Sequence, residues 1–208
     1  MFWLSWLRSS QRCSESSQSK LRSFHCRSLA QDLPAYLIEE FLPLSDALIV
    51  HPPIVRRVRP GDARPSFFLA GSIEMGKAED WQAKAIASLR DMASIIYNPR
   101  RPDWNSSWEQ DIANPDFNVQ VNWELDHIDR ADFVLMYFDP ATQSPITLVE
   151  FGRLSVHDPN KVLLCCPKGF WRKGNVDIIC ERDGITQFDT LDEMLEQARN
   201  VARIFRRK

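Results

Sequence analysis

The chain has 208 residues, of which 44% are hydrophobic and 26% charged, and its formal net charge at pH 7 is −2. This length and composition are typical of one globular domain with a terminal extension. Because the chain has no excess of basic residues, we expect neither nucleic acid nor a membrane surface as a partner. No apolar run approaches the roughly 20 residues that a transmembrane helix needs.

Residues 1–30 differ in composition from everything that follows. They hold nine serines and five Lys or Arg residues but a single acid, Glu15. This composition is typical of organelle transit peptides and also of untargeted disordered tails, and both interpretations stay open. We therefore expect a cytoplasmic protein, or a mitochondrial one if residues 1–30 act as a transit peptide. Residues 31–65 are expected to form a proline-rich extension with one short helix at 35–42, and residues 66–208 the main domain.

The sequence carries no pattern for a metal or a cofactor. Its five cysteines are odd in number and include no CxxC pair, which indicates reduced thiols. The four histidines are too scattered for a zinc site. Neither the dinucleotide fingerprint GxGxxG nor the phosphate loop GxxxxGK[ST] occurs. We expect no cofactor and no metal.

From residue 67 the hydrophobic pattern alternates between short apolar runs and amphipathic stretches. Strands are predicted at 67–73, 95–97, 133–138 and 161–166, and helices at 78–92, 119–130, 145–156 and 191–205. This alternation predicts an α/β fold, a flavodoxin-like or Rossmann-like three-layer sandwich with a mainly parallel sheet of four or five strands. Ligands of such sheets bind beyond the carboxyl ends of the strands, so the segments 70–75, 98–108 and 139–150 are the candidate binding loops.

Two features of these loops suggest a ligand. Gly71 could let the backbone approach a ligand closely, or could merely allow the turn from strand to helix. Trp104 and Trp108 stand in a polar loop and could stack on a flat ring such as a nucleobase. Trp81, by contrast, lies on an apolar helical stripe, where packing is expected.

Glu124 is the first candidate for acid–base chemistry. Val121, Leu125 and Ile128 would form an apolar stripe on its helix, and Glu124 lies about 40° from that stripe at 100° per residue. A carboxyl group at this position should be partly desolvated, which would raise its pKa and suit a general acid. The alternative is a glutamate at the helix boundary that reaches into water.

Glu150 is the second candidate, and two interpretations are balanced. Thr147 to Glu150 fits a capping box, and Ser144 before Pro145 fits a helix N-cap. Alternatively, a carboxylate near a helix N-terminus is favoured in its ionised form, which a nucleophile requires.

The order of several motifs resembles one known family. These motifs are FLAGSIE, Asp80-Trp81-Gln82, Asn98-Pro99-Arg100-Arg101, Asp103-Trp104, Gln120-Val121-Asn122-Trp123-Glu124, Ala131-Asp132 and SPITLVEFG. Over roughly Pro65 to Ile179 they resemble the nucleoside 2-deoxyribosyltransferase-like family. The resemblance implies a flavodoxin-like fold, chemistry at C1′ of a nucleoside, and a possible homo-oligomer.

By this resemblance, Glu150 is the catalytic nucleophile and Glu124 the second carboxylate. A retaining glycosyl transfer uses two carboxyl groups about 5 to 5.5 Å apart, which agrees with such a pair. The expected partners are a small nucleoside and a nucleobase. The residues expected to bind the substrate are Gly71, Ser72, Asn98, Asp103, Trp104 and Ser144.

The chain departs from the family pattern at three places. Phe67 and Phe68 stand where the transferases usually carry a tyrosine, and Ser144 replaces their aspartate. A serine there resembles the related deoxynucleoside monophosphate N-glycosidases, but Glu74 replaces the arginine with which those bind the 5′-phosphate. We therefore expect an unphosphorylated sugar, with transfer and hydrolysis both open. The alternative is a non-catalytic nucleoside- or nucleotide-binding module of the same fold.

Overall fold

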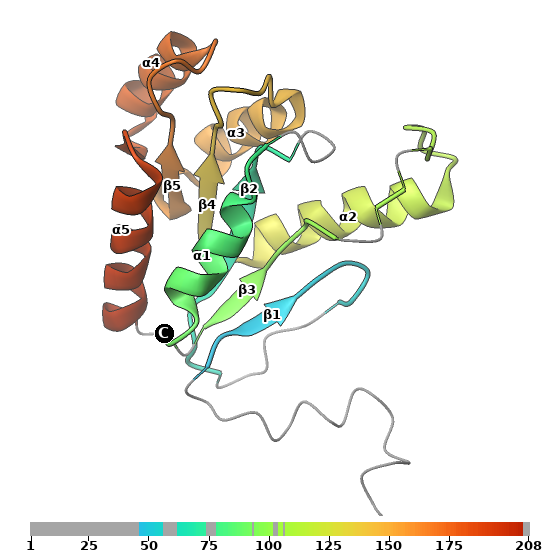
Figure 1. The fold of residues 1–208 in the computed structure, drawn as a ribbon, viewed down its shortest axis with the longest axis horizontal. Helices are drawn as coiled ribbons and strands as arrows, with labels where there is room; N and C mark the ends of the chain where they lie inside the picture. The colour runs from blue at the N-terminus through green and yellow to red at the C-terminus, as the bar shows by residue number, and fades with distance from the viewer. Residues whose placement is uncertain are drawn as a thin grey trace, which may run out of the picture. The chain divides into compact units, whose positions relative to one another are not determined.

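A computed structural model describes residues 46–55, 62–73, 78–92, 94–101, 104–105 and 107–205. The predicted tail 1–30, the predicted helix at 35–42, Glu74 and Asp103 all lie outside these residues. The described residues contain a six-stranded sheet in the order β1-β3-β2-β4-β5-β6, and every neighbouring pair is parallel. This architecture confirms the predicted α/β class (Figure 1), although the sheet has more strands than the four or five expected.

The elements follow one another along the chain as strands alternating with helices. The strands are β1 (Leu48–Val50), β2 (Ser66–Gly71), β3 (Ile95–Tyr97), β4 (Phe133–Tyr137), β5 (Val162–Cys165) and β6 (Thr186–Phe188). The helices are α1 (Trp81–Leu89), α2 (Pro115–Arg130), α3 (Pro145–His157), the short 3-10 helix η3 (Pro159–Lys161), α4 (Lys173–Asp183) and α5 (Leu191–Ile204).

Helices cover both faces of the sheet (Figure 1). Phe67 and Phe68 are adjacent on β2 and at most 1% exposed, yet they belong to different hydrophobic clusters because successive strand residues point to opposite faces. The Phe68 cluster packs against α2, α3 and α4, whereas the Phe67 cluster packs against α1 and α5. Strands β2 to β5 are buried on both faces, which explains why they read as short continuous apolar runs.

The strand order reverses its direction of winding between β2 and β4. The chain leaves β2 through α1 to reach β3 on one side, then crosses through α2 to reach β4 on the other side. Strands β2 to β6 thus have the flavodoxin-like order, with β1 added at the edge beside β3. In sheets of this order, ligands bind at the carboxyl ends of the two strands where the direction of winding reverses.

Besides the short 3-10 helix η3, three elements were not predicted from the sequence. Strand β1 has only three residues before His51 and two prolines, and it lies within the range 31–65 expected to be an extension. Strand β6 is similarly short and carries Thr and Gln, and α4 has no apolar stripe strong enough to reveal it. Short edge strands are stabilised by pairing with a neighbour, here β3 and β5, and a local pattern does not show this.

Helix α2 begins earlier than predicted and buries a different face. Asn114 caps it by accepting from the backbone N–H groups of Asp116 and Phe117. The predicted stripe of Val121, Leu125 and Ile128 was wrong, because Leu125 is 36% exposed. The residues that α2 buries are Gln120, Trp123, His127 and Ile128. Glu124 lies one turn from both Gln120 and Ile128 and therefore belongs to the inward face.

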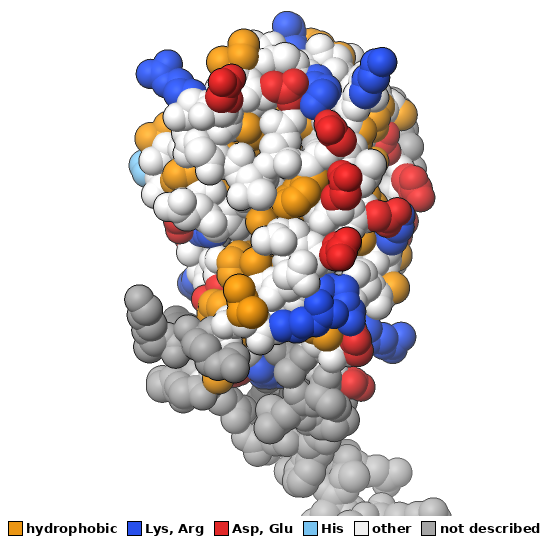
Figure 2. Space-filling view, turned by 90° about the vertical axis from the view of Figure 1, so that its left-hand side faces the viewer, with side chains coloured by type: hydrophobic (Ala, Val, Ile, Leu, Met, Phe, Trp, Pro, Cys, Tyr) orange, Lys and Arg blue, Asp and Glu red, His pale blue; other side chains and the backbone are white. Residues whose placement is uncertain are grey.

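Many charged side chains lie on the face that carries α5. Figure 2 shows a run of acidic side chains on this side of the molecule with a group of basic side chains below it. Helix α5 contributes Asp192 and Glu193 in its first turn and Arg203 in its last, an arrangement that complements the helix dipole. In the described part of the chain, no helix has the length and apolar character needed to cross a membrane.

Candidate active site

The carboxyl end of β2 is marked by Gly71, which packs tightly against β4 and α1. A Cβ atom on this residue would lie 2.5 Å from the Tyr137 carbonyl oxygen and 2.8 Å from the Trp81 ring. Trp81 is itself 1% exposed, as its apolar stripe predicts, and its Nε1 donates to the Ser72 carbonyl at 3.1 Å. Close packing of the backbone thus requires glycine here, independently of any ligand.

Three hydroxyl groups meet directly beyond Gly71. Ser72 Oγ lies 2.5 Å from Ser144 Oγ and 2.9 Å from Thr142 Oγ1, and the two latter atoms are 2.8 Å apart. The Asp139 backbone N–H also donates to Ser72 Oγ at 2.9 Å. All three side chains are buried. This cluster ties the loop after β4 to the end of β2 and fixes the start of α3.

Ser144 is held in an unusual backbone conformation. Its φ of 49° lies in the left-handed region, where a residue other than glycine costs roughly 1 kcal/mol or more. Helix α3 starts at Pro145 as predicted, but Ser144 makes no side-chain capping bond. The predicted capping box was wrong, since Thr147 and Glu150 both lie inside the helix. Strain of this kind occurs at positions that the surrounding structure fixes, often near functional sites.

The two candidate carboxylates lie on neighbouring helices of the same layer. Glu124 is on α2 and Glu150 on α3, both partly buried, and their charges interact. One turn farther along, Arg153 of α3 donates to Asp129 of α2 at 2.7 Å, an ion pair that holds the helices together. Because no capping box forms, a capping role does not explain why a glutamate stands at position 150.

Both carboxyl groups bind a proton unusually tightly. Burial raises the pKa of Glu124 from 4.5 to about 7, although a hydrogen bond from Gln120 opposes the shift. Burial, together with the charge of Glu124, raises the pKa of Glu150 to about 8. The expectation that the helix dipole would keep Glu150 ionised was wrong, because the dipole acts mainly within the first turn and Glu150 lies beyond it. Near neutral pH the pair therefore holds about one proton, and its two apparent pKa values belong to the pair.

Gln120 is a residue of the site that the sequence did not single out. It is 2% exposed, and its Nε2 donates to Glu124 Oε1 at 2.8 Å and to the Pro99 carbonyl at 3.2 Å. The same side chain therefore fixes the carboxylate and joins it to the loop after β3. A polar residue four positions before a helical glutamate was the available signal, since such pairs face each other.

The loop after β3 carries the other predicted substrate residues. Asn98 is buried, and its Oδ1 accepts from the Arg100 backbone N–H at 3.0 Å. Trp104 is 38% exposed and packs edge-on against Trp108, with ring centroids 5.1 Å apart. The Arg101 guanidinium lies 5.6 Å from the Trp108 ring and donates to Gln120 Oε1 at 3.5 Å. This aromatic pair is thus connected to Glu124 through Arg101 and Gln120.

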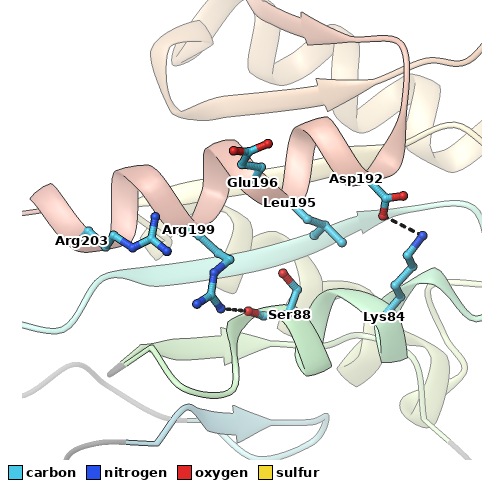
Figure 3. A pocket seen from close by; sticks show the side chains of 7 residues that line it. All are labelled: Lys84, Ser88, Asp192, Leu195, Glu196, Arg199 and Arg203. Carbon is cyan, nitrogen blue, oxygen red and sulfur yellow. Dashed lines mark hydrogen bonds and ion pairs between the residues drawn. The ribbon is translucent and has the colours of Figure 1, made fainter.

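Two of the cavities in the described part of the domain have charged linings. One of about 360 Å³ lies between α1 and α5 (Figure 3), on the face opposite the carboxylates. Its charged residues are largely satisfied, because Lys84 pairs with Asp192 at 2.8 Å and Arg199 with Asp91 at 2.7 Å. The other, of about 230 Å³, lies at the carboxyl ends of β1 and β3. Nowhere among the described residues do three His, Cys, Asp or Glu side chains converge as metal ligands.

The fold and the site together define a class of protein, a doubly wound α/β domain with an interacting pair of buried carboxyl groups on two neighbouring helices. The family model described as "Nucleoside 2-deoxyribosyltransferase like" matches residues 64–170. The chain belongs to this family, which confirms the resemblance inferred from the sequence motifs. A search of curated proteins found no match.

The carboxyl pair should make the stability of the fold depend on pH. The folded protein binds protons more tightly than the unfolded chain between pH 4.5 and about 8, so the free energy of unfolding should fall as pH rises through this window. Glu150→Gln should therefore stabilise the protein at pH 8 by roughly 2 kcal/mol, allowing for screening at a partly exposed site, and by nothing at pH 4.5. Urea unfolding at both pH values measures this difference. Glu181→Gln on exposed α4 is the control, and an equal effect of Glu150→Gln at both pH values would contradict the predicted coupling.

Proposed function

We propose that the protein cleaves the N-glycosidic bond of a deoxynucleoside through a covalent sugar intermediate on Glu150. The observation that carries this proposal is the pairing of Glu124 with Glu150 on adjacent helices, each with a raised pKa, in a chain of this family. Two carboxyl groups with perturbed pKa values in one site are a common signature of acid–base and nucleophilic catalysis.

In the first proposed step, the ionised carboxylate of Glu150 attacks C1′ of the sugar. The bond between C1′ and the base nitrogen breaks, its electron pair leaves with the base, and Glu124 supplies the proton that the base takes up. In the second step, the nitrogen of another base or a water molecule attacks C1′. Glu150 then leaves, and Glu124 accepts the proton from the acceptor.

The substrate has to determine which carboxyl group carries the proton. In the ligand-free protein burial raises the pKa of both groups, whereas the reaction needs the charge on Glu150 and the proton on Glu124. The positive charge that develops on the sugar ring in the transition state would stabilise the Glu150 carboxylate and favour this arrangement. Gln120 supports it by fixing the orientation of Glu124.

For the predicted substrate residues we propose roles that follow their positions. Trp104 is exposed enough to stack on the base. The hydroxyl groups of Ser72 and Ser144 already bind each other. Together with Gly71, they would therefore shape the binding site through packing and would not bind the substrate directly. Asn98 would hold the loop after β3 in place. The partners are a nucleoside and a nucleobase, and the exposed apolar residues Val149 and Val156 of α3 leave room for a second copy of the chain.

The test is a reaction of purified protein with each deoxynucleoside, with and without a different free base, followed by mass spectrometry. Exchanged nucleoside indicates transfer, and free base without acceptor indicates hydrolysis. A deoxynucleoside with fluorine at C2′ of the sugar should leave the fluorinated sugar attached to the peptide that contains Glu150. Tight nucleoside binding with neither turnover nor adduct would sink the proposal and favour the non-catalytic binding module.

A further inference from the structure

Three polar groups surround the buried amide of Gln120 on the inward face of α2. The amide nitrogen Nε2 lies 3.2 Å from the Pro99 carbonyl oxygen and 2.8 Å from Glu124 Oε1. The amide oxygen Oε1 lies 3.5 Å from Arg101 Nη1. The amide therefore joins the acid of the carboxyl pair to the loop after β3.

These neighbours allow only one orientation of the Gln120 amide. A backbone carbonyl can only accept a hydrogen bond, and a guanidinium group can only donate one. Nε2 must therefore face Pro99, and Oε1 must face Arg101. The reverse orientation would place two acceptors together at Pro99 and two donors together at Arg101, which is costly inside a protein.

The orientation of the amide determines what Glu124 Oε1 can do. Nε2 carries two N–H groups, and because the Pro99 carbonyl takes one, the other points at Glu124 Oε1. Oε1 therefore accepts a hydrogen bond whether Glu124 is ionised or protonated. In a protonated carboxyl group the carbonyl oxygen accepts better than the hydroxyl oxygen, so the proton belongs on the other oxygen, Oε2.

The place of this proton matters for a general acid. Burial raises the pKa of Glu124 to about 7, so its protonated form is well populated near neutral pH. A general acid acts only when its proton lies within hydrogen-bond reach of the atom that receives it. Holding the proton on one oxygen removes the unproductive arrangement with the proton on the other.

We propose that Gln120 is a positioning residue that keeps the proton of Glu124 on Oε2 and so presents it to the departing base. The inference rests on the proposed function for the base, and on the hydrogen bonds of Gln120 alone for the place of the proton. Pro99 and Arg101 belong to the loop that carries Trp104, so the loop proposed to bind the base also orients the acid.

Infrared spectroscopy of the protonated carboxyl group tests the place of the proton without any turnover. The Glu150→Gln protein is measured at about pH 5.5, where burial keeps Glu124 protonated, and the band is assigned by its loss on adding Glu124→Gln. Adding Gln120→Met should move the C=O stretching band to higher wavenumber, because the carbonyl oxygen Oε1 loses its hydrogen bond. Gln187→Met removes an amide that donates to Asp177, and this matched control should leave the band in place.

The same substitution in the otherwise wild-type protein tests the positioning role in the reaction. Gln120→Met should lower kcat for a deoxynucleoside by about tenfold or more, because the proton is no longer held in place. On 4-nitrophenyl 2-deoxyriboside, whose leaving group needs no proton, this variant should keep most of its activity. Gln187→Met should leave both rates unchanged.

A band that does not move in Gln120→Met, or an unchanged kcat for the deoxynucleoside, would overturn the inference. If Gln120→Met does not fold, as judged by circular dichroism, NMR of the Gln120 side-chain amide in the Glu150→Gln protein decides the question. The N–H that faces Glu124 should stay protected from solvent exchange above and below the pKa of Glu124, and loss of protection on protonation would overturn the inference.

The two proposals fail in different ways. A band that moves, in a protein whose wild type shows no turnover, would refute the proposed function alone. Turnover by the wild type, together with a band that does not move, would refute this inference alone.

Discussion

Glu150→Gln is expected to reduce turnover of a deoxynucleoside by at least about a thousandfold, because it removes the proposed nucleophile while preserving the size of the side chain. Ligand binding should change little, since the amide occupies the same partly buried position on α3. Initial rates and ligand affinities for both proteins measure the two effects separately. Asp126→Asn, an exposed carboxylate on α2, is the control that should keep its activity.

A second variant separates a nucleophile from a structural carboxylate. In Glu150→Ala, the space left by the carboxylate should admit a small anion such as azide. Azide can attack C1′, so that the base leaves with the electron pair of its bond to C1′ and the sugar is released as a glycosyl azide. Recovery of base release with azide, and appearance of that product, would identify the position of attack. A Glu150→Gln protein within a few-fold of wild-type activity would refute the nucleophile assignment.

Glu124→Gln is expected to slow cleavage of natural nucleosides by about a hundredfold to ten-thousandfold, the usual contribution of a general acid. The loss should be much smaller for 4-nitrophenyl 2-deoxyriboside, because its leaving group, 4-nitrophenolate, departs without a proton. The ratio of the two losses is the diagnostic measurement. Equal losses on both substrates would contradict the assignment and indicate that Glu124 serves the structure.

The pH–rate profile provides an independent measurement of the same pair. The reactive state carries one proton, so the wild type should show a bell-shaped profile with its maximum between about pH 7 and 8. In Glu124→Gln the decline at high pH should disappear, because no general acid remains to lose its proton. The decline at low pH should move to lower pH, since the charge of Glu124 no longer raises the pKa of Glu150.

Whether the sugar is transferred to another base or to water should depend on the loop between β4 and α3. Ser144 occupies the position of the transferase aspartate in the sequence resemblance, and its hydroxyl group contacts Ser72 and Thr142 inside the protein. The loop is thus fixed by the hydroxyl group of Ser72, directly after β2, and by that of Thr142 in the loop itself. Its geometry, more than a direct contact from Ser144, would govern which acceptor reaches C1′.

Much of the fold could be predicted from the sequence because it is encoded locally. Short apolar runs alternating with amphipathic stretches define β2 to β5 with α1, α2, α3 and α5, and glycine and proline mark their ends. The start of α3 at Pro145 followed from proline chemistry alone. The sequence also identified Glu124 and Glu150 as candidates, through helical position and the order of motifs.

Other features depend on contacts between distant segments. Strand β1 exists because three residues pair with β3, and the inward face of α2 is set by packing against Phe68 and the loop after β3, not by its strongest apolar stripe. The tertiary structure alone decided that the charges of Glu124 and Glu150 interact and that both carboxyl groups have raised pKa values. Burial and charge coupling arise between Glu124 and Glu150, which lie on different helices, and no local pattern records them.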